Sequence, residues 1–139
     1  MKNYIILLLS FVLILIGCAD QIVSDCDSIQ IQVLPEGTTF AQIQNEVFST
    51  NCALSGCHGT NSPQADLDLS SGNAYVNLVN VQSVLYPSLK RIVPGNSSQS
   101  LLIKALKGED APLMPSSGKL PNSVIDSIAA WIDRGAVNN

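Results

Sequence analysis

Two cysteines and a histidine lie close together near the middle of the chain. Cys52 and Cys57 are five positions apart and His58 follows directly, in the stretch Cys-Ala-Leu-Ser-Gly-Cys-His-Gly. Covalent attachment of haem uses the motif Cys-x-x-Cys-His, in which two thiols reach the vinyl groups on one porphyrin edge and the imidazole is held beneath the iron. This chain carries a version with two extra residues between the thiols. Gly56 can adopt a left-handed turn without a Cβ clash, so the extra length can loop outward.

The same two cysteines could instead form a small disulfide loop, with His58 incidental. The chain has four cysteines, namely Cys18, Cys26, Cys52 and Cys57. If Cys52 and Cys57 carry haem and Cys18 is modified as described below, Cys26 is left over, which in an exported protein suggests a free or intermolecular thiol. A disulfide from Cys26 to either motif cysteine would leave the other motif thiol unpaired.

The first 17 residues have the pattern of an export signal. Lys2 supplies a positive charge, and residues 4–16 are almost wholly apolar. This run is too short for a membrane span, which needs about 20 apolar residues, and it matches a secretory signal. It ends in Leu15-Ile16-Gly17-Cys18, which resembles the bacterial lipobox, where the signal is cut before a cysteine that is then diacylated. The resemblance implies that Cys18 carries the lipid, with an ordinary signal peptide or an uncleaved anchor as the alternatives.

We therefore expect three parts: a signal peptide at 1–17, a tether at 18–37 and one domain at 38–139. Within the tether, residues 28–34 alternate apolar and polar side chains, which is typical of a short strand or of an extended linker. Removal of the signal leaves six basic and eleven acidic side chains, a net charge of −5. A mildly acidic domain without a basic patch is a poor candidate for nucleic-acid binding.

Apolar residues of the domain recur at helical spacing and predict an all-α fold. The pattern predicts helices at about residues 39–50, 74–79, 99–107 and 122–134. The expected N-caps are Thr38 or Thr39, Ser70 or Ser71, and Ser97 or Ser98 for the first three helices. Gly108 and Gly135 are expected to end the last two. Between these two helices, Pro112, Pro115 and Pro121 exclude a helix over residues 109–121.

One methionine is the candidate for the sixth position on the iron. Beyond residue 18 the chain has a single His, which excludes two histidine ligands within one molecule, and a single Met, Met114. Met114 precedes Pro115, and a residue before proline favours extended geometry, which suits a side chain that reaches inward from a loop. His/Met ligation raises the reduction potential and is typical of electron-transfer cytochromes. A lone Met is otherwise core filler, and Lys107, Lys119 or water are lesser candidates for the iron.

The order of an N-terminal helix, the Cys–Cys-His motif, middle helices, a Met-Pro loop and a C-terminal helix resembles the class I cytochrome c fold. Several segments are more closely similar to bacterial exported single-haem domains related to planctomycete-type cytochromes. The segments are Val47 to Cys52, Gly56 to Gly59, Leu67 to Ser70, Val93 to Asn96, Ser100 to Lys104, Met114-Pro115 and Ile128 to Ala136. Together they span residues 47–136, most of the domain.

The resemblance implies a bundle of three to five short helices around one covalent haem c. It implies that the haem is attached to Cys52 and Cys57, with His58 below the iron and Met114 above. The four residues between the thiols depart from the family motif and admit a single thioether bond through Cys57. No residue is offered as a catalytic acid, base or nucleophile.

We therefore expect a one-electron carrier rather than an enzyme, with an unidentified redox protein as its partner. Its expected place is the bacterial cell envelope, held by the lipid on Cys18 on the periplasmic side or at the outer membrane. The alternative is a haem-free structural or binding lipoprotein with a Cys52–Cys57 disulfide. A haem enzyme or gas sensor is a third interpretation, if Met114 does not bind the iron.

The resemblance also predicts packing. The first and last helices are expected to cross, with Phe48 against Trp131 or Ile128. Candidates for the haem face are Leu67, Leu69 and Leu101. Lys90 and Arg91 could pair with haem propionates, although a solvated charged pair is the commoner role for such residues.

Overall fold

The computed structural model describes residues 34–61 and 63–139. The chain divides into two compact units, Met1–Gln30 and Ile31–Asn139, and the described residues all belong to the second. Several expectations fall outside the described residues. They concern the signal peptide at 1–17, the lipid on Cys18, the role of Cys26, and residues 28–33 of the expected strand at 28–34. These expectations stay predictions.

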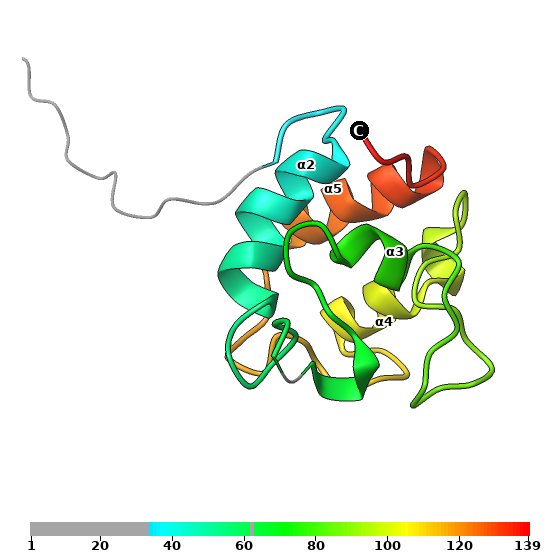
Figure 1. The fold of residues 1–139 in the computed structure, drawn as a ribbon. Coiled ribbons are helices and arrows are strands. Elements are labelled where there is room, and N and C mark those ends of the chain that lie inside the picture. The colour runs from blue at the N-terminus through cyan, green and yellow to red at the C-terminus, as the bar shows by residue number, and fades with distance from the viewer. Residues whose placement is uncertain (1–33, 62) are drawn as a thin grey trace, which may run out of the picture. The chain divides into compact units, whose positions relative to one another are not determined.

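The described part of the chain is helical, which confirms the predicted all-α class (Figure 1). The elements in order are α2 (Phe40–Ile43), η1 (Gln44–Cys52), η2 (Gln64–Asp66), α3 (Ala74–Leu78), η3 (Ser97–Gln99), α4 (Leu101–Lys107) and α5 (Asn122–Asp133). Extended pairing over residues 34–61 and 63–139 is limited to isolated bridges, such as Val79 with Ile92. No helix in this part is long and apolar enough to cross a membrane.

The first helix begins as α2 and continues as the π-helix η1 as far as Cys52. Thr39 caps it as predicted: its Oγ1 accepts a hydrogen bond from the Gln42 backbone at 3.2 Å, and Gln42 Oε1 accepts one from the Thr39 backbone at 2.9 Å. This reciprocal pair satisfies two N–H groups that the first turn leaves free. The helix was expected to end at residue 50. It instead runs to Cys52, because the Ala53 backbone N–H donates to the Phe48 carbonyl, five residues earlier, at 2.7 Å and continues the π-helix.

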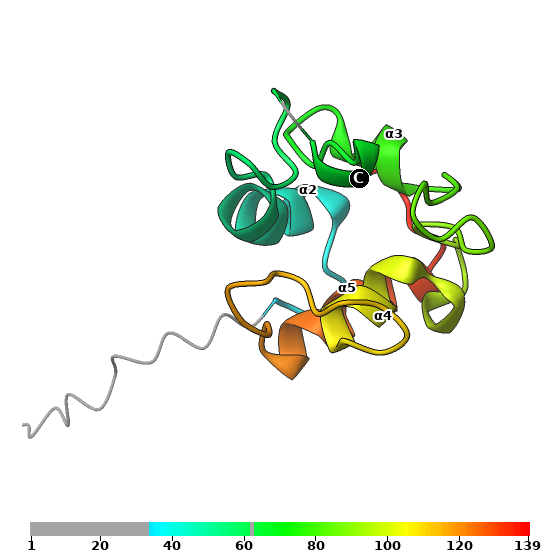
Figure 2. The same ribbon diagram turned by 90° about the horizontal axis from the view of Figure 1, so that it is seen from below.

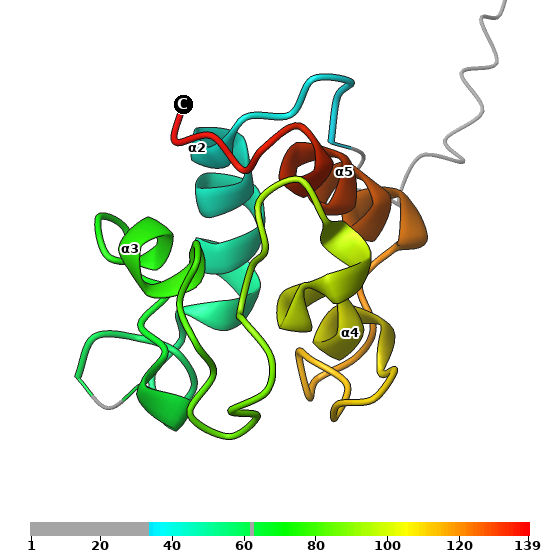
Figure 3. The same cartoon turned by 90° about the vertical axis from the view of Figure 1, so that its right-hand side faces the viewer.

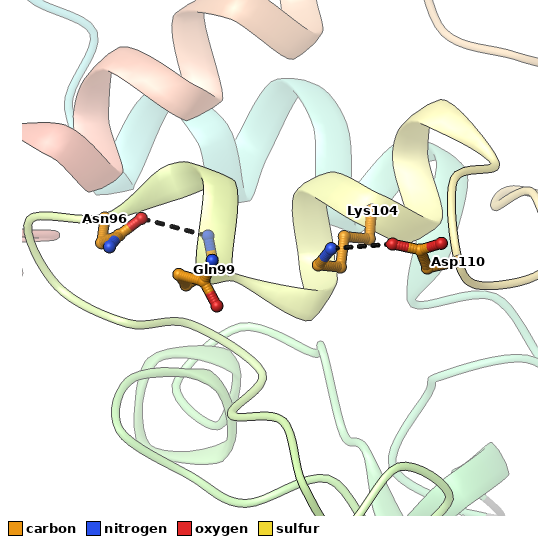
Figure 4. A network of polar contacts seen from close by, with 4 residues as sticks. All are labelled: Asn96, Gln99, Lys104 and Asp110. Atoms are coloured by element: carbon orange, nitrogen blue, oxygen red, sulfur yellow. Dashed lines mark hydrogen bonds and ion pairs between the residues drawn. The ribbon is translucent and has the colours of Figure 1, made fainter.

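The later helices lie where the apolar spacing predicts them, but two of the predicted caps are wrong. Neither Ser70 nor Ser71 caps α3, whose N-terminus has no side-chain cap; the Ser70 backbone N–H and hydroxyl instead donate to Asp68 Oδ1. Neither Ser97 nor Ser98 caps the next helix. Asn96 does so instead, as its Oδ1 accepts from the Gln99 backbone at 3.1 Å (Figure 4). That cap opens the short helix η3, so the predicted single helix over 99–107 is divided, and α4 starts at residue 101.

The predicted ends of the last two helices are close to those observed. Gly108 follows α4 with a φ of +72°, the left-handed conformation that glycine adopts without a steric penalty. Gly135 has a φ of +104° and follows Arg134 after α5. The loop over residues 109–121 contains no helix, as its prolines predicted.

Phe40 is the aromatic hub of the core. Its ring centroid lies 5.2 Å from that of Tyr75, 5.5 Å from Trp131 and 6.4 Å from Phe48. Phe48, Trp131 and Ile128 all belong to the buried core. The Phe40 ring contacts the rings of both Phe48 and Trp131. These contacts join α2 to α5, which lie side by side in Figures 1 and 3.

The last residues of the chain fold back onto the start of the first helix. The Asn139 side chain accepts a hydrogen bond from the Phe40 backbone at 2.9 Å, and its carbonyl accepts one from Ala41 at 3.0 Å. Tyr75 Oη donates to the Ala136 carbonyl, and Trp131 Nε1 donates to the Val137 carbonyl, both at 2.9 Å. Residues 136–139 therefore cap the first helix and cover the aromatic hub together.

Replacement of Phe40 by Ala should lower the free energy of unfolding by about 3–5 kcal/mol, because it leaves a cavity among three rings. Denaturant unfolding followed by circular dichroism measures the change. Val76, which is 68% exposed, offers the matched control, since Val76→Ala should alter stability by no more than about 0.5 kcal/mol. An equal loss in both variants would contradict the role of Phe40 as the hub.

Candidate functional site

The residues between the two motif cysteines form a closed turn. The Cys57 backbone N–H donates to the Leu54 carbonyl at 3.0 Å, and Gly56 has a φ of +79°, the left-handed conformation that the sequence anticipated. The His58 N–H donates to the Cys52 carbonyl at 3.0 Å, which returns the chain to the end of η1. Leu54 is 46% exposed. The extra residues thus project outward, while Cys52 and His58 stay adjacent.

Gly59 lies under this turn. A Cβ atom at Gly59 would be 3.0 Å from the Ala53 carbonyl oxygen and 3.1 Å from that of Leu54. Both contacts are with backbone atoms, which cannot swing aside as the end of a side chain can. The turn between the thiols therefore favours a residue without a side chain directly after His58.

Two backbone carbonyls orient the His58 ring. Its Nδ1 atom lies 3.1 Å from the carbonyl oxygens of both Gln64 and Leu67. A carbonyl oxygen only accepts, so in the neutral ring these partners place the proton on Nδ1 and leave the lone pair on Nε2. This is the arrangement of metal-binding histidines, in which one ring nitrogen donates to the protein and the other is free for the metal.

The turn that supplies these carbonyls is held by Arg91. The backbone of Ala65 and Asp66 has positive φ angles of 57° and 52°, which carry a cost of about 1–3 kcal/mol for each non-glycine residue. Arg91 Nη2 donates to the Ala65 carbonyl at 2.9 Å and to that of Asp66 at 3.1 Å, and Nη1 donates to Asn77 at 2.9 Å. Burial lowers the pKa of Arg91, and the Asp66 carboxylate acts in the opposite direction.

The two cationic residues expected near the haem differ in their surroundings. Lys90 is exposed, and its Nζ donates to Asn80 Oδ1 at 3.3 Å, as the solvated alternative predicts. Arg91 is 6% exposed and lines an apolar cavity. The solvated interpretation is therefore wrong for Arg91.

Two adjoining hollows lie beside the motif. The first, of about 160 Å³, is almost wholly apolar, and its walls include the three leucines expected at the haem face, Leu67, Leu69 and Leu101. The second, of about 410 Å³, adds Cys57, Leu54 and Pro115. The two share Cys52, His58, Leu85 and Met114.

Volume alone does not identify this site. Two other hollows, of about 380 and 390 Å³, have neither a cysteine nor a histidine in their walls. The hollows beside the motif are distinguished by their chemistry, because they combine thiol, imidazole, thioether and guanidinium groups with aliphatic walls.

Met114 reaches both hollows from the loop over residues 109–121. Its backbone N–H donates to the Ala105 carbonyl at 2.9 Å, which fixes the loop to α4. Lys104 Nζ and Asp110 Oδ2 form an ion pair of 3.0 Å that fastens the start of the same loop (Figure 4). The peptide bond from Met114 to Pro115 is cis. In Figures 1 and 2 this loop, drawn in orange, lies next to η1.

The structure therefore brings together the four residues that the sequence singled out within the domain. Cys52, Cys57, His58 and Met114 all line the hollows. Lys107 and Lys119, the other candidates for the iron, are exposed and line neither.

Both motif thiols are free, and they differ in environment. Cys57 is exposed, whereas Cys52 is half-buried. Burial, together with the nearby Cys57, raises the pKa of the Cys52 thiol to about 11. Cys52 is therefore a neutral thiol at physiological pH.

No family model, no curated protein and no solved structure matches this chain. Within residues 34–61 and 63–139, no three or more His, Cys, Asp and Glu side chains are grouped so that they could hold a metal ion.

Sequence reasoning missed the turn at residues 64–67 and the role of Arg91 in holding it. Backbone carbonyls carry no residue-specific signal, and neither Ala65 nor Asp66 is the glycine that usually marks a positive φ. Leu85, which is 66% exposed and lines both hollows, was missed as well. Its irregular segment gives no periodic pattern to place it.

Replacement of Gly59 by Ala should lower the free energy of unfolding by about 1–3 kcal/mol, because the new methyl group meets two backbone carbonyls. Denaturant unfolding of the reduced protein measures this directly. The matched control is Ser55→Ala, at an exposed residue of the same turn, which should change stability by no more than about 0.5 kcal/mol. If Ser55→Ala destabilised the protein as much as Gly59→Ala, the inferred crowding under the turn would be wrong.

Proposed function

We propose that this chain is a monohaem c-type cytochrome, a one-electron carrier with a class I-like cytochrome c fold. Cys52 and Cys57 would hold the haem c covalently, and His58 and Met114 would bind its iron. The observation that carries the proposal is the state of His58. Its Nδ1 is engaged by two carbonyls, and its ring lines an apolar cavity that Cys52 and Met114 also line.

The residues of the site fit a haem group. A flat apolar ring needs apolar walls, and aliphatic side chains line the smaller hollow. Leu85 and Met114 are 66% and 39% exposed although they line both hollows, so a ligand there would cover large apolar side chains that now meet solvent. Burial of such a group would also add apolar core to a small domain.

When bound, haem c supplies one-electron redox chemistry. His58 would offer its Nε2 lone pair to the iron, and the carbonyls of Gln64 and Leu67 keep the ring in the tautomer that this requires. The Met114 thioether would favour the reduced state of the iron and so raise the reduction potential. Arg91 places a positive charge in the wall, where a haem propionate is a suitable partner because the guanidinium has N–H donors to spare.

The proposed location rests on the lipobox-like Leu15-Ile16-Gly17-Cys18, which lies outside the described residues. On this proposal the lipid on Cys18 holds the carrier at the bacterial cell envelope, and residues 18–37 join it to the haem domain. An exported redox protein is the expected partner. The exposed Cys57 and Leu54 lie at the edge through which electrons would pass.

Intact mass of the exported protein tests the proposal. We expect one haem and the lipid on a single chain, and a denatured band that retains haem stain because thioether bonds survive denaturation. Replacement of Cys18 by Ala should remove the lipid mass and release the protein from membranes, but leave the haem in place.

The variants Cys52→Ala and Cys57→Ala show which thiols form thioether bonds. A colourless wild-type chain, lighter by two hydrogens than the chain with free thiols, would instead establish the Cys52–Cys57 disulfide and end the cytochrome proposal.

Replacement of Met114 by Ala should convert the low-spin absorption spectrum to a high-spin one and lower the reduction potential, because the thioether ligand is lost. Absorbance and redox titration measure the two effects. Leu113→Ala is the matched control, since Leu113 is 38% exposed in the same loop and lines neither hollow. An unchanged low-spin spectrum in Met114→Ala would remove Met114 as a ligand.

A further inference from the structure

Four consecutive backbone carbonyls serve two functional side chains. The carbonyls of Gln64 and Leu67, at the ends of the turn, accept from His58 Nδ1. The carbonyls of Ala65 and Asp66, in its middle, accept from Arg91 Nη2. We propose that Arg91 is a positioning residue for His58, because it holds this turn in the one conformation that presents the outer carbonyls to the ring.

The turn needs an external hold. Ala65 and Asp66 both have left-handed backbone angles, which a side chain bearing a Cβ disfavours. Within the turn, one backbone bond closes it, from the Leu67 N–H to the Gln64 carbonyl at 3.2 Å. Reversal of either left-handed residue would rotate the inner carbonyls away from Arg91 and shift the outer pair away from His58.

The hold is specific to a guanidinium. Nη2 donates to two carbonyls, while Nη1 donates to the carbonyl of Asn77 in α3, so one planar group joins the turn to the helix. A lysine ammonium is a point charge without this fork. The Arg91 backbone is itself fixed, since its N–H donates to Val81 at 2.7 Å and its carbonyl accepts from Leu102 at 3.0 Å. The Arg91 guanidinium therefore extends from a segment whose backbone is fixed by hydrogen bonds.

The inference deepens the proposed function, because His58 is the iron ligand there. Its test measures the His58 Nδ1 proton by nuclear magnetic resonance in the reduced holoprotein. In Arg91→Lys and Arg91→Met, exchange of this proton with solvent should become roughly tenfold faster, as the loss of hydrogen bonds to the turn loosens it. Arg134→Lys is the matched control: Arg134 Nη2 also donates to a backbone carbonyl, that of Thr38 at 2.8 Å, outside the two hollows.

The lysine variant separates position from charge. If Arg91 acts only through its positive charge, Arg91→Lys should exchange like the wild type, and that result would overturn the proposal. Lysine also preserves most of the side-chain volume, so Arg91→Lys carries the test alone if Arg91→Met does not fold.

A second substitution tests the turn itself. Glycine adopts positive φ freely, so Ala65→Gly in the Arg91→Lys background should restore slow exchange in part. Failure to restore any protection would show that Arg91 does not act through this turn.

Failure of the cytochrome proposal can be recognised separately. If the chain takes up no haem, the nitrogen shifts of His58 in the haem-free protein, taken where the ring is neutral, report the fraction of the Nδ1–H tautomer. That fraction should fall in Arg91→Lys and stay unchanged in Arg134→Lys. An equal fraction in the wild type and Arg91→Lys would overturn the positioning role, whatever the cofactor.

Discussion

The hydrogen bonds from His58 Nδ1 to two backbone carbonyls are the interaction on which the site depends. They fix the ring against the cavity wall, and they exist only because the chain turns twice in the left-handed region at Ala65 and Asp66. That turn is held from within the core by Arg91. On its far side, Leu69 is held as well, since its N–H donates to the His58 carbonyl at 2.8 Å and its carbonyl accepts from Gln44 Nε2 at 3.0 Å. The segment that orients the imidazole is thus fastened both to η1 and to the buried arginine.

The core has two parts that differ in composition and packing. The aromatic hub around Phe40 closes the end of the domain where α2, α5 and the last residues meet, and it is densely packed and buried. The other end, where η1 stops at Cys52, is built from aliphatic side chains that enclose space. A small domain has little apolar surface with which to stabilise itself. An apolar group bound among these leucines would therefore contribute stability as well as chemistry, which ties folding of the cysteine end to cofactor attachment in the proposed cytochrome.

Much of the fold was predictable because helix caps and helix-breaking residues act on residues next to them in the sequence. Examples are the capping pair of Thr39 and Gln42, the glycine at the end of α4, Gly108, and the prolines of residues 109–121. The π-helical coil of η1 was not predictable, because apolar spacing over nine residues does not separate it from an α-helix. The hydrogen bond that the Asn139 side chain accepts from Phe40 depends on tertiary approach, and the one that Asp68 accepts from Ser70 stands where a cap was expected. The grouping of Cys52, Cys57, His58 and Met114 was anticipated from residue chemistry, whereas the turn that orients His58 is made of backbone and leaves no such trace.

The first helix separates the point where the described chain begins from the two cysteines. Leu34 is buried against the core, and its carbonyl accepts from Ser127 of α5, so the segment from the N-terminal side joins the domain near the first turn of the helix. Cys52 is at the other end of the same continuous helix, a distance on the order of 20 Å for 13 residues. A force applied at residue 34 would therefore act at the end of the first helix opposite the thiols.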